Sequence, residues 1–223
     1  VYSFPPVPRT VAFLTVLHAV PDMQGSTHTQ FSHPTLEIPV SLSHSLIQSY
    51  RFGNHIMTLT NYDYIIYTDG GCIGNPGPGG YGAVVLKGKD RHELTGGYSL
   101  TTNNRMELMA AIVALGETEP HSRILLYSDS RYLVDGITKG WAESWRKNKW
   151  KKADKRKALN VDLWKVLLSL IEDREVTFSW VEGHAGNREN ERCDVLSVKA
   201  AKQRNLPPDT GYETENASQG QLF

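Results

Sequence analysis

Residues 64–80 read YIIYTDGGCIGNPGPGG, and this stretch decides the fold class. Its first five residues, 64–68, are β-branched or aromatic, which favours a short strand, and Asp69 follows them directly. Residues 70–80 are rich in glycine and proline and predict a turn. The two runs that come next, 81–87 and 91–99, suit an antiparallel pair of strands. Three strands therefore open the domain.

Helices and strands alternate after this opening. Residues 103–117 have apolar side chains at helical spacing, and Thr102 or Asn103 can cap the start. A strand is expected at 123–128, directly before Asp129. The order is completed by helices at 131–138, 161–171 and 191–204 and by a strand at 175–181. This order predicts an α/β fold with a mixed sheet flanked by helices.

The ends of the chain differ from this central domain, which we expect at 57–204. Residues 1–56 hold only four charged side chains and show no helical or strand period, which predicts a poorly ordered leader. Met57 is a candidate start, in which case the leader would not be part of the native protein. The alternative is a targeting or partner-binding segment. Residues 205–223, with Pro207 and Pro208, are expected to be a loop-like tail.

Composition narrows the function classes. A net charge of zero and 39% hydrophobic residues are ordinary for a globular protein. No apolar run has the ~18 residues that a membrane-spanning helix needs. Cys72 and Cys193 are the only cysteines, which favours a reduced, cytoplasmic setting, with a disulfide between them as the alternative.

Four carboxylates are candidates for chemistry. Asp69 and Asp129 follow strands, at the carboxyl edge where open α/β sheets bind ligands. Glu107 lies near a helix start between apolar neighbours, and Asp194 is expected to open the final helix. Carboxylates that converge repel one another unless cations neutralise them, and oxygen ligands favour Mg²⁺ or Mn²⁺. Taken singly, each has an ordinary alternative as a turn former, a solvated side chain or a charge at a helix N-terminus.

Five motifs in order resemble those of bacterial type I ribonuclease H. They are YTDGGCxGNPGPGG at 67–80, TTNNRME at 101–107, SDS at 128–130, VxGHAG at 181–186 and ENERCD at 189–194. The resemblance covers about residues 62–212. It implies a ribonuclease H-like fold, a five-stranded mixed sheet flanked by helices with its second strand antiparallel to the others.

The resemblance also implies a reaction. It indicates an endonuclease that hydrolyses the RNA strand of RNA–DNA hybrids with two Mg²⁺ ions, for which Mn²⁺ can substitute, and leaves 5′-phosphate and 3′-hydroxyl ends. Asp69 would bridge both ions, Asp129 would hold the ion on the nucleophile side, and Glu107 and Asp194 would hold the other. His184 resembles a mobile histidine that assists proton transfer or product departure. Without the resemblance, a histidine in this setting is an ordinary loop residue.

Further residues are implied to contact the hybrid. Asn75, Asn103 and Asn104 resemble substrate-contacting residues, and Cys72 would lie beside the DNA strand. Turn and cap chemistry is the alternative for the three asparagines. Arg131 stands where relatives often carry a glutamine that contacts the minor groove. Arginine could donate similar hydrogen bonds or bind a phosphate instead.

A basic handle is expected at 141–157. From Arg146 to Lys157 there are eight Lys or Arg and one acid, interleaved with tryptophans. This charge suits a phosphate backbone, and the matching region of the family grips the DNA strand. We also expect the charged run to be a solvated helix, held by a small satellite core of the tryptophans. The proposed contacts are Trp141, Trp145, Lys149, Lys151 and Lys152.

Taken together, these features predict a cytoplasmic monomer that binds RNA–DNA hybrids and no membrane. Three rivals are the ribonuclease H domain of a retroelement polyprotein, a catalytically inactive module of the same fold and a Ca²⁺-stabilised structural domain. The presence of all four carboxylates argues against the inactive module, and the handle is not explained by the structural domain. No polymerase motifs accompany the domain, which argues against the polyprotein.

Overall fold

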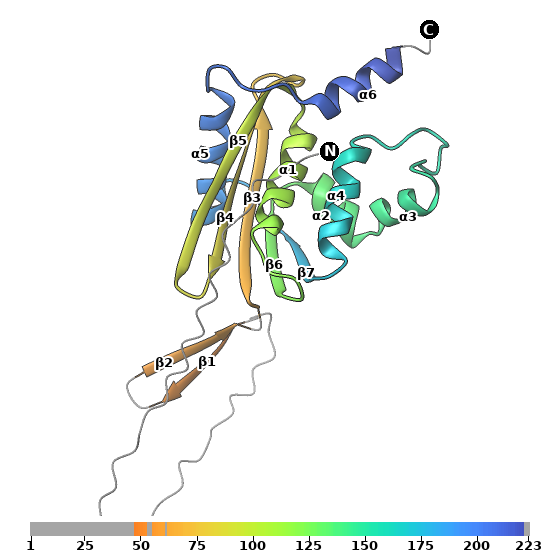
Figure 1. Cartoon of the computed structure of the whole chain (residues 1–223). Helices are drawn as coiled ribbons and strands as arrows, with labels where there is room; N and C mark the ends of the chain where they lie inside the picture. The colour runs from red at the N-terminus through yellow and green to blue at the C-terminus, as the bar shows by residue number, and fades with distance from the viewer. Residues whose placement is uncertain (1–46, 53–54, 61, 221–223) are drawn as a thin grey trace, which may run out of the picture. The chain divides into compact units, whose positions relative to one another are not determined.

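A five-stranded mixed sheet forms the centre of the domain (Figure 1). The structure is a computed structural model that describes residues 47–52, 55–60 and 62–220. The strand order is β5-β4-β3-β6-β7, and β4 is antiparallel to the other four, as predicted. The strands are β3 (Tyr64–Cys72), β4 (Gly77–Lys87), β5 (Asp90–Thr101), β6 (Arg123–Ser128) and β7 (Glu175–Trp180).

Helices cover both faces of this sheet (Figure 1). The helices of the described structure are α1 (Asn103–Gly116), α2 (Arg131–Thr138), α3 (Trp141–Lys147), α4 (Val161–Ile171), α5 (Arg188–Ala201) and α6 (Thr210–Gly220), and α3 and α6 lie away from the sheet. Two glycines of the sheet show how closely the helices α1 and α5 approach it. A Cβ on Gly70 would lie 2.3 Å from the carbonyl carbon of Met106 in α1, and one on Gly82 would lie 2.3 Å from the Cys193 carbonyl oxygen in α5. Gly82 is the register partner of Asp69, which precedes Gly70, so α1 and α5 pack on opposite faces.

The main core lies between the sheet and the helices α1 and α4. Ile66 of β3, Leu126 of β6, Met106 of α1 and Trp164 of α4 have no exposed surface. Burying each such side chain stabilises the fold by about 1.5–3 kcal/mol. This core fixes the strands whose ends carry the candidate carboxylates.

Several element boundaries differ from the prediction, and those around Asp69 and Asp194 concern the site. The strand expected at 64–68 continues through Asp69 to Cys72, because its glycines and those at the start of β4 pair as a ladder (Cys72 with Gly79). The turn is therefore confined to residues 73–76. Asp194 lies in the second turn of α5 rather than at its start, because the Asn187 side chain accepts from Asn190 N and begins the helix at Arg188.

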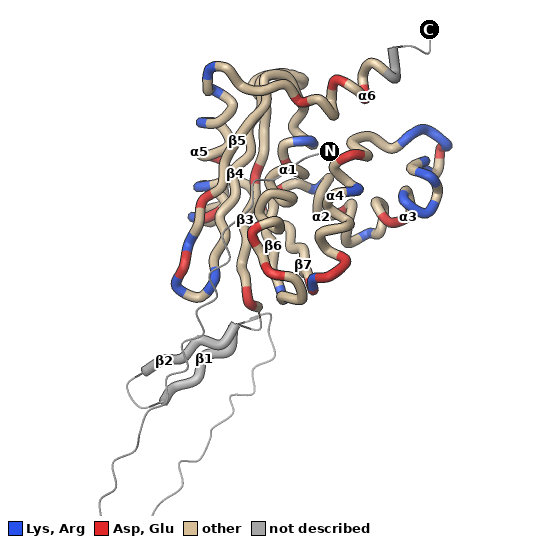
Figure 2. The backbone as a smooth tube through the Cα atoms, viewed as in Figure 1, with Lys and Arg blue, Asp and Glu red and all other residues tan. Residues whose placement is uncertain are grey.

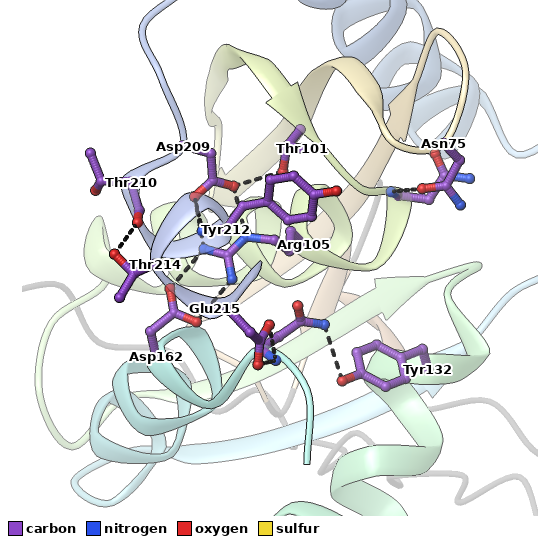
Figure 3. Close-up of polar contacts among 12 residues, drawn as sticks. Asn75, Thr101, Arg105, Tyr132, Asp162, Asp209, Thr210, Tyr212, Thr214 and Glu215 are labelled. Atoms are coloured by element: carbon purple, nitrogen blue, oxygen red, sulfur yellow. Dashed lines mark hydrogen bonds and ion pairs between the residues drawn. The ribbon is translucent and has the colours of Figure 1, made fainter. Parts of the chain in front are cut away.

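The prediction of loop for the C-terminal tail is wrong over Thr210–Gly220, which is α6. A buried ion pair holds the residue before this helix (Figure 3). Asp209 accepts hydrogen bonds from Arg105 Nε and from the Thr101 hydroxyl, both at 2.7 Å. Arg105 also donates to both carboxylate oxygens of Asp162 in α4. Local helix propensity does not predict tertiary contacts of this kind.

A separate two-stranded antiparallel hairpin is formed by β1 (Ile47–Phe52) and β2 (His55–Thr60). The prediction of no strand before residue 57 is wrong here, and the expected boundary falls inside β2, where Met57 pairs with Tyr50. Backbone pairing defines this hairpin rather than a periodic apolar face. The rest of the predicted leader, residues 1–46, lies outside the described residues. None of the helices in the described part of the chain is long and apolar enough to cross a membrane.

Candidate active site

Two of the predicted carboxylates are neighbours on adjacent strands. Thr68 and Ser128 are register partners in the parallel pair β3–β6. Asp69 and Asp129 each come one residue later, so they extend from the same end and the same face of the sheet. Asp69 Oδ1 accepts a hydrogen bond from its neighbour Gly70 N at 2.7 Å.

Asp129 is held by groups from β7 and α5. Asn190 Nδ2 of α5 donates to Asp129 Oδ2 at 3.3 Å, and Trp180 Nε1 of β7 donates to the Asp129 carbonyl oxygen at 3.0 Å. Gly183 lies against the same carboxylate, since a Cβ there would be 2.8 Å from Oδ2. The loop after β7 therefore adjoins this acid.

Glu107 joins α1 to α2. It is half-buried, and the Ser130 hydroxyl donates to its Oε2. Ser130 is also the N-cap of α2, where its oxygen accepts from Leu133 N at 3.1 Å. One serine therefore orients the carboxylate and begins the next helix.

The four carboxylates are near enough to influence one another electrostatically. Burial raises the pKa of Asp69 to about 7, with further contributions from the charges of Asp129, Asp194 and Glu107 and an opposing hydrogen bond from Gly70. Burial also raises the pKa of Glu107. The Ser130 hydrogen bond opposes this rise, and the charge of Asp129 adds to it. No cation is among these causes. The sheet edge is thus a concentrated, uncompensated negative site.

This site fits divalent cations by its chemistry. Within residues 62–217, no three His, Cys, Asp or Glu side chains are close enough to enclose an ion as they stand. Like charges favour such separation, and local donors engage Asp69, Glu107 and Asp129. Four carboxylates are hard oxygen ligands that suit Mg²⁺ and Mn²⁺, and cations would relieve the repulsion that raises the Asp69 pKa.

Asp69→Asn is expected to stabilise the metal-free protein at pH 8 by on the order of 1–3 kcal/mol. Because the folded-state pKa is raised, ionised Asp69 is penalised above pH 7, and this penalty disappears as pH falls from about 7 towards the ordinary value near 4. Urea unfolding in EDTA at pH 8 and pH 4 checks this. The exposed control Asp90→Asn should show no such pH-dependent gain, and an equal gain for Asp69→Asn at both pH values would contradict the reasoning.

His184 is exposed on the loop between β7 and α5. Its backbone has a positive φ of 56°, which is uncommon outside glycine. Since its neighbour Gly183 contacts Asp129, the loop places this histidine at the rim of the carboxylate site.

The three asparagines have different positions. Asn103 Oδ1 accepts from Cys72 N at 2.8 Å, and Asn103 N donates to Asn75 Oδ1 at 3.3 Å, so they tie the loop after β3 to the start of α1. Thr102 occupies the N-cap position but makes no capping hydrogen bond through its side chain. Asn75 and Asn104 line a cavity of about 350 Å³ together with residues of α6.

Neither cysteine forms the disulfide that was left as an alternative, because both are free thiols. Burial, followed by the charges of Asp209 and Glu107, raises the pKa of Cys72 to about 11. Its thiol is therefore protonated at neutral pH. Cys193 is buried, and its thiol donates to the Tyr67 carbonyl oxygen.

The basic handle comprises α3 and the segment that follows it (Figure 2). Some of its arginines are paired, as Arg156 is with Asp154. In the described structure, no carboxylate pairs with the three lysines predicted to bind substrate, Lys149, Lys151 and Lys152. Trp141 is 40% exposed, whereas Trp145 packs edge-on against the buried Trp164 with ring centroids 6.0 Å apart. Trp145 therefore has a packing role, as expected of the handle tryptophans, and it packs against the main core.

Four residues around the site were not singled out from the sequence: Arg105, Ser130, Trp180 and Asn190. A signal existed for two of them. Helical spacing places Arg105 on one stripe with Met109 and Ile112, and Asn190 on one stripe with Cys193, all of them buried. A polar residue on a buried stripe needs a specific partner. The contacts of Ser130 and Trp180 depend on tertiary structure alone.

The mixed sheet and its acidic edge define a protein of the ribonuclease H-like class. The family model described as RNase H matches residues 61–202, and the chain belongs to the ribonuclease H family, whose members are endonucleases. It is 59% identical over 157 residues to the ribonuclease H of Trichodesmium erythraeum (strain IMS101), covering 70% of this chain and all of that protein. It is 53% identical over 157 residues to the ribonuclease HI of Synechocystis sp. (strain ATCC 27184 / PCC 6803 / Kazusa), covering 70% and 98%.

Solved structures have the same fold. LC9-RNase H1, described as a type 1 RNase H with the type 2 active-site motif, matches with a TM-score of 0.56 and 33% identity over 69% of this chain and 80% of that one. A foamy viral protease–reverse transcriptase in complex with an RNA/DNA hybrid matches with a TM-score of 0.56 at 17% identity, over 63% of this chain and 20% of that one. This second likeness concerns the fold alone.

Proposed function

We propose that this protein hydrolyses the RNA strand of RNA–DNA hybrids with two divalent cations held by Asp69, Glu107, Asp129 and Asp194. The observation that carries the proposal is the placement of Asp69 and Asp129 at the same end of the parallel strands β3 and β6, with Ser130 tying Glu107 to the residue after Asp129. Bound Mg²⁺ ions would supply Lewis-acid activation of water and charge stabilisation at the phosphate. The products would carry 5′-phosphate and 3′-hydroxyl ends.

Within this proposal, the protein's own side chains position the metal-binding carboxylates and supply a proton. Ser130 orients Glu107, and Asn190 orients Asp129, so these two carboxylates are held before substrate binds. His184, exposed beside them, would carry a proton to the departing 3′-oxygen or assist product departure. Asn75, Asn103 and Asn104 would contact the hybrid, and Cys72 would lie beside the DNA strand.

The proposal is tested with a hybrid that carries a 5′-labelled RNA strand. We expect cleavage of this strand in Mg²⁺ or Mn²⁺ and none in EDTA, with single-stranded RNA, duplex RNA and duplex DNA left intact. Phosphatase sensitivity of the downstream product reports its 5′-phosphate. Calorimetric titration of Mn²⁺ into the protein gives a readout independent of turnover. Cleavage in EDTA, or cleavage of duplex DNA at a similar rate, would overturn the proposal.

His184→Ala is expected to slow turnover by about 10²-fold without eliminating it, because general acid–base assistance is typically worth ~10²–10⁴-fold. The positive φ at this position requires a second variant, since alanine adopts it poorly. His184→Asn tolerates the backbone and removes the titrating ring. Similar losses in both variants support a proton-transfer role, whereas wild-type rates across the pH profile would leave His184 an ordinary loop residue.

Neutralising the three handle lysines, as Lys149→Asn, Lys151→Gln and Lys152→Gln together, should weaken hybrid binding and reduce its salt dependence. Each lost phosphate contact lowers the slope of log affinity against log salt by up to about 0.9. The matched control neutralises three exposed lysines elsewhere, Lys89, Lys199 and Lys202. Fluorescence anisotropy at several salt concentrations measures the affinity and the salt slope of both triple variants. Equal slopes for the two triple variants would show that the handle lysines are merely solvated.

The proposal includes action as a cytoplasmic monomer. Static light scattering of the purified protein measures its mass in solution. Cell fractionation measures its location. A dimer mass or recovery with membranes would contradict this part of the proposal.

A further inference from the structure

Arg131 at the start of α2 stacks on Trp180 at the end of β7. The guanidinium carbon lies 3.5 Å from the centroid of the indole ring, which is a close cation–π contact. Both side chains are exposed, Trp180 by 37%. At this distance the ring covers the central carbon of the guanidinium, and no hydrogen bond within the described structure engages its N–H groups.

The indole is itself fixed to the active site. Trp180 Nε1 donates to the carbonyl oxygen of Asp129, at 3.0 Å. Arg131 follows Ser130, whose hydroxyl binds Glu107. The stacking therefore holds the guanidinium against a ring that is itself bonded to the Asp129 backbone, and ordering it on substrate binding costs less side-chain entropy than for a free arginine.

The charge of Arg131 is not neutralised by the protein. Among the described side chains, no carboxylate pairs with it, and the close contact found is the stacking on Trp180. Within the described residues, an unpaired cation thus stands two residues after Asp129 and stacks on the tryptophan that binds the Asp129 backbone.

We propose that the Arg131–Trp180 pair binds a backbone phosphate of the RNA strand next to the bond that is cleaved. A guanidinium presents paired N–H donors that match two phosphate oxygens, and its full charge favours a phosphate over a neutral base edge. The acidic edge repels the polyanionic backbone, and a fixed cation at the rim offsets this repulsion locally. This inference rests on the proposed function, because it assumes that the hybrid is the substrate.

The first test replaces Arg131 by glutamine and measures cleavage of a labelled hybrid. We expect Arg131→Gln to raise KM by about tenfold and to change kcat by less than about twofold, since a hydrogen bond to a charged group is lost in both the bound and the transition state. The salt slope of hybrid binding in EDTA should fall by about 0.7–0.9. Arg204→Gln, at an exposed arginine beyond α5, is the control and should leave both values unchanged.

The second test identifies the phosphate. Hybrids are prepared with a single uncharged methylphosphonate at successive positions of the RNA strand around one cleavage site. At one position the penalty of Arg131→Gln should disappear, because the contact is already absent. Arg131→Lys should retain the salt slope but lose part of the affinity, and Trp180→Leu should behave similarly, since each removes the stacking and keeps the charge.

The outcomes separate this inference from the function on which it rests. A penalty that is equal on every methylphosphonate substrate, or a changed sequence preference with a wild-type salt slope, would overturn the phosphate contact while hybrid cleavage stands. The latter result would indicate base recognition by Arg131. If the wild-type protein cleaves no hybrid at all, the proposed function itself fails, and binding in EDTA still reports whether Arg131 contacts a phosphate.

Discussion

Asp69→Asn is expected to reduce the rate of hybrid cleavage by at least about a thousandfold, about 4 kcal/mol of transition-state stabilisation. Burial and three like charges raise the pKa of Asp69 to about 7. Its ionised form would therefore gain stability from bound cations. A neutral amide keeps the shape of the side chain but removes the charge that would hold the ions. Initial rates in Mg²⁺ on a labelled hybrid measure the loss.

Binding by the same variant is expected to stay within about threefold of wild type, because the handle lysines are unchanged and one phosphate-repelling charge is removed. Anisotropy with the uncut hybrid in EDTA measures this. Asp90→Asn, at an exposed position on β5, is the matched control and should retain full activity. Wild-type-like turnover by Asp69→Asn would end the assignment of this site. A loss of binding equal to the loss of rate would instead indicate a general structural defect.

Arg105→Met is expected to lower the free energy of unfolding by about 3–5 kcal/mol, the largest stability effect among these variants. Arg105 is fully buried, and Asp209 is 2% exposed in its side chain, so the variant leaves a buried carboxylate without its cation. The other partner, Asp162, is 34% exposed and remains partly solvated. Burial alone would lower the pKa of Arg105, but the two carboxylates raise it, so the guanidinium is charged in the folded state.

Urea unfolding measures this loss, and Arg91→Met is the comparison. Arg91 pairs with Glu93 and Glu189 at the surface, where such pairs contribute at most about 1 kcal/mol. The double variant Arg105→Met with Asp209→Asn should lose less than the sum of the two single variants, because the uncompensated charge is gone. A loss below about 1 kcal/mol for Arg105→Met would contradict this account. Proteolysis of the α6 segment should also become faster, since Asp209 no longer anchors it.

Local patterns were sufficient for most of the fold. The strand at 123–128 and the helices at 131–138 and 161–171 were predicted to the residue, because a short apolar run and helical spacing are clear there. The glycines around Asp69 were less informative. Their composition predicted a turn. In the structure they lie in the strands, where the close packing of α1 and α5 requires glycine.

By itself, the sequence determined the order of strands and helices, the presence of four candidate carboxylates and the resemblance to the ribonuclease H family, because these depend on residue type and spacing along the chain. Only the tertiary structure decided that Asp129 is held by Asn190, that Arg105 anchors Asp209 before α6, and that Arg131 stacks on Trp180. Each of these contacts joins residues at least 49 positions apart. Their strength comes from burial and geometry, which a linear pattern does not contain.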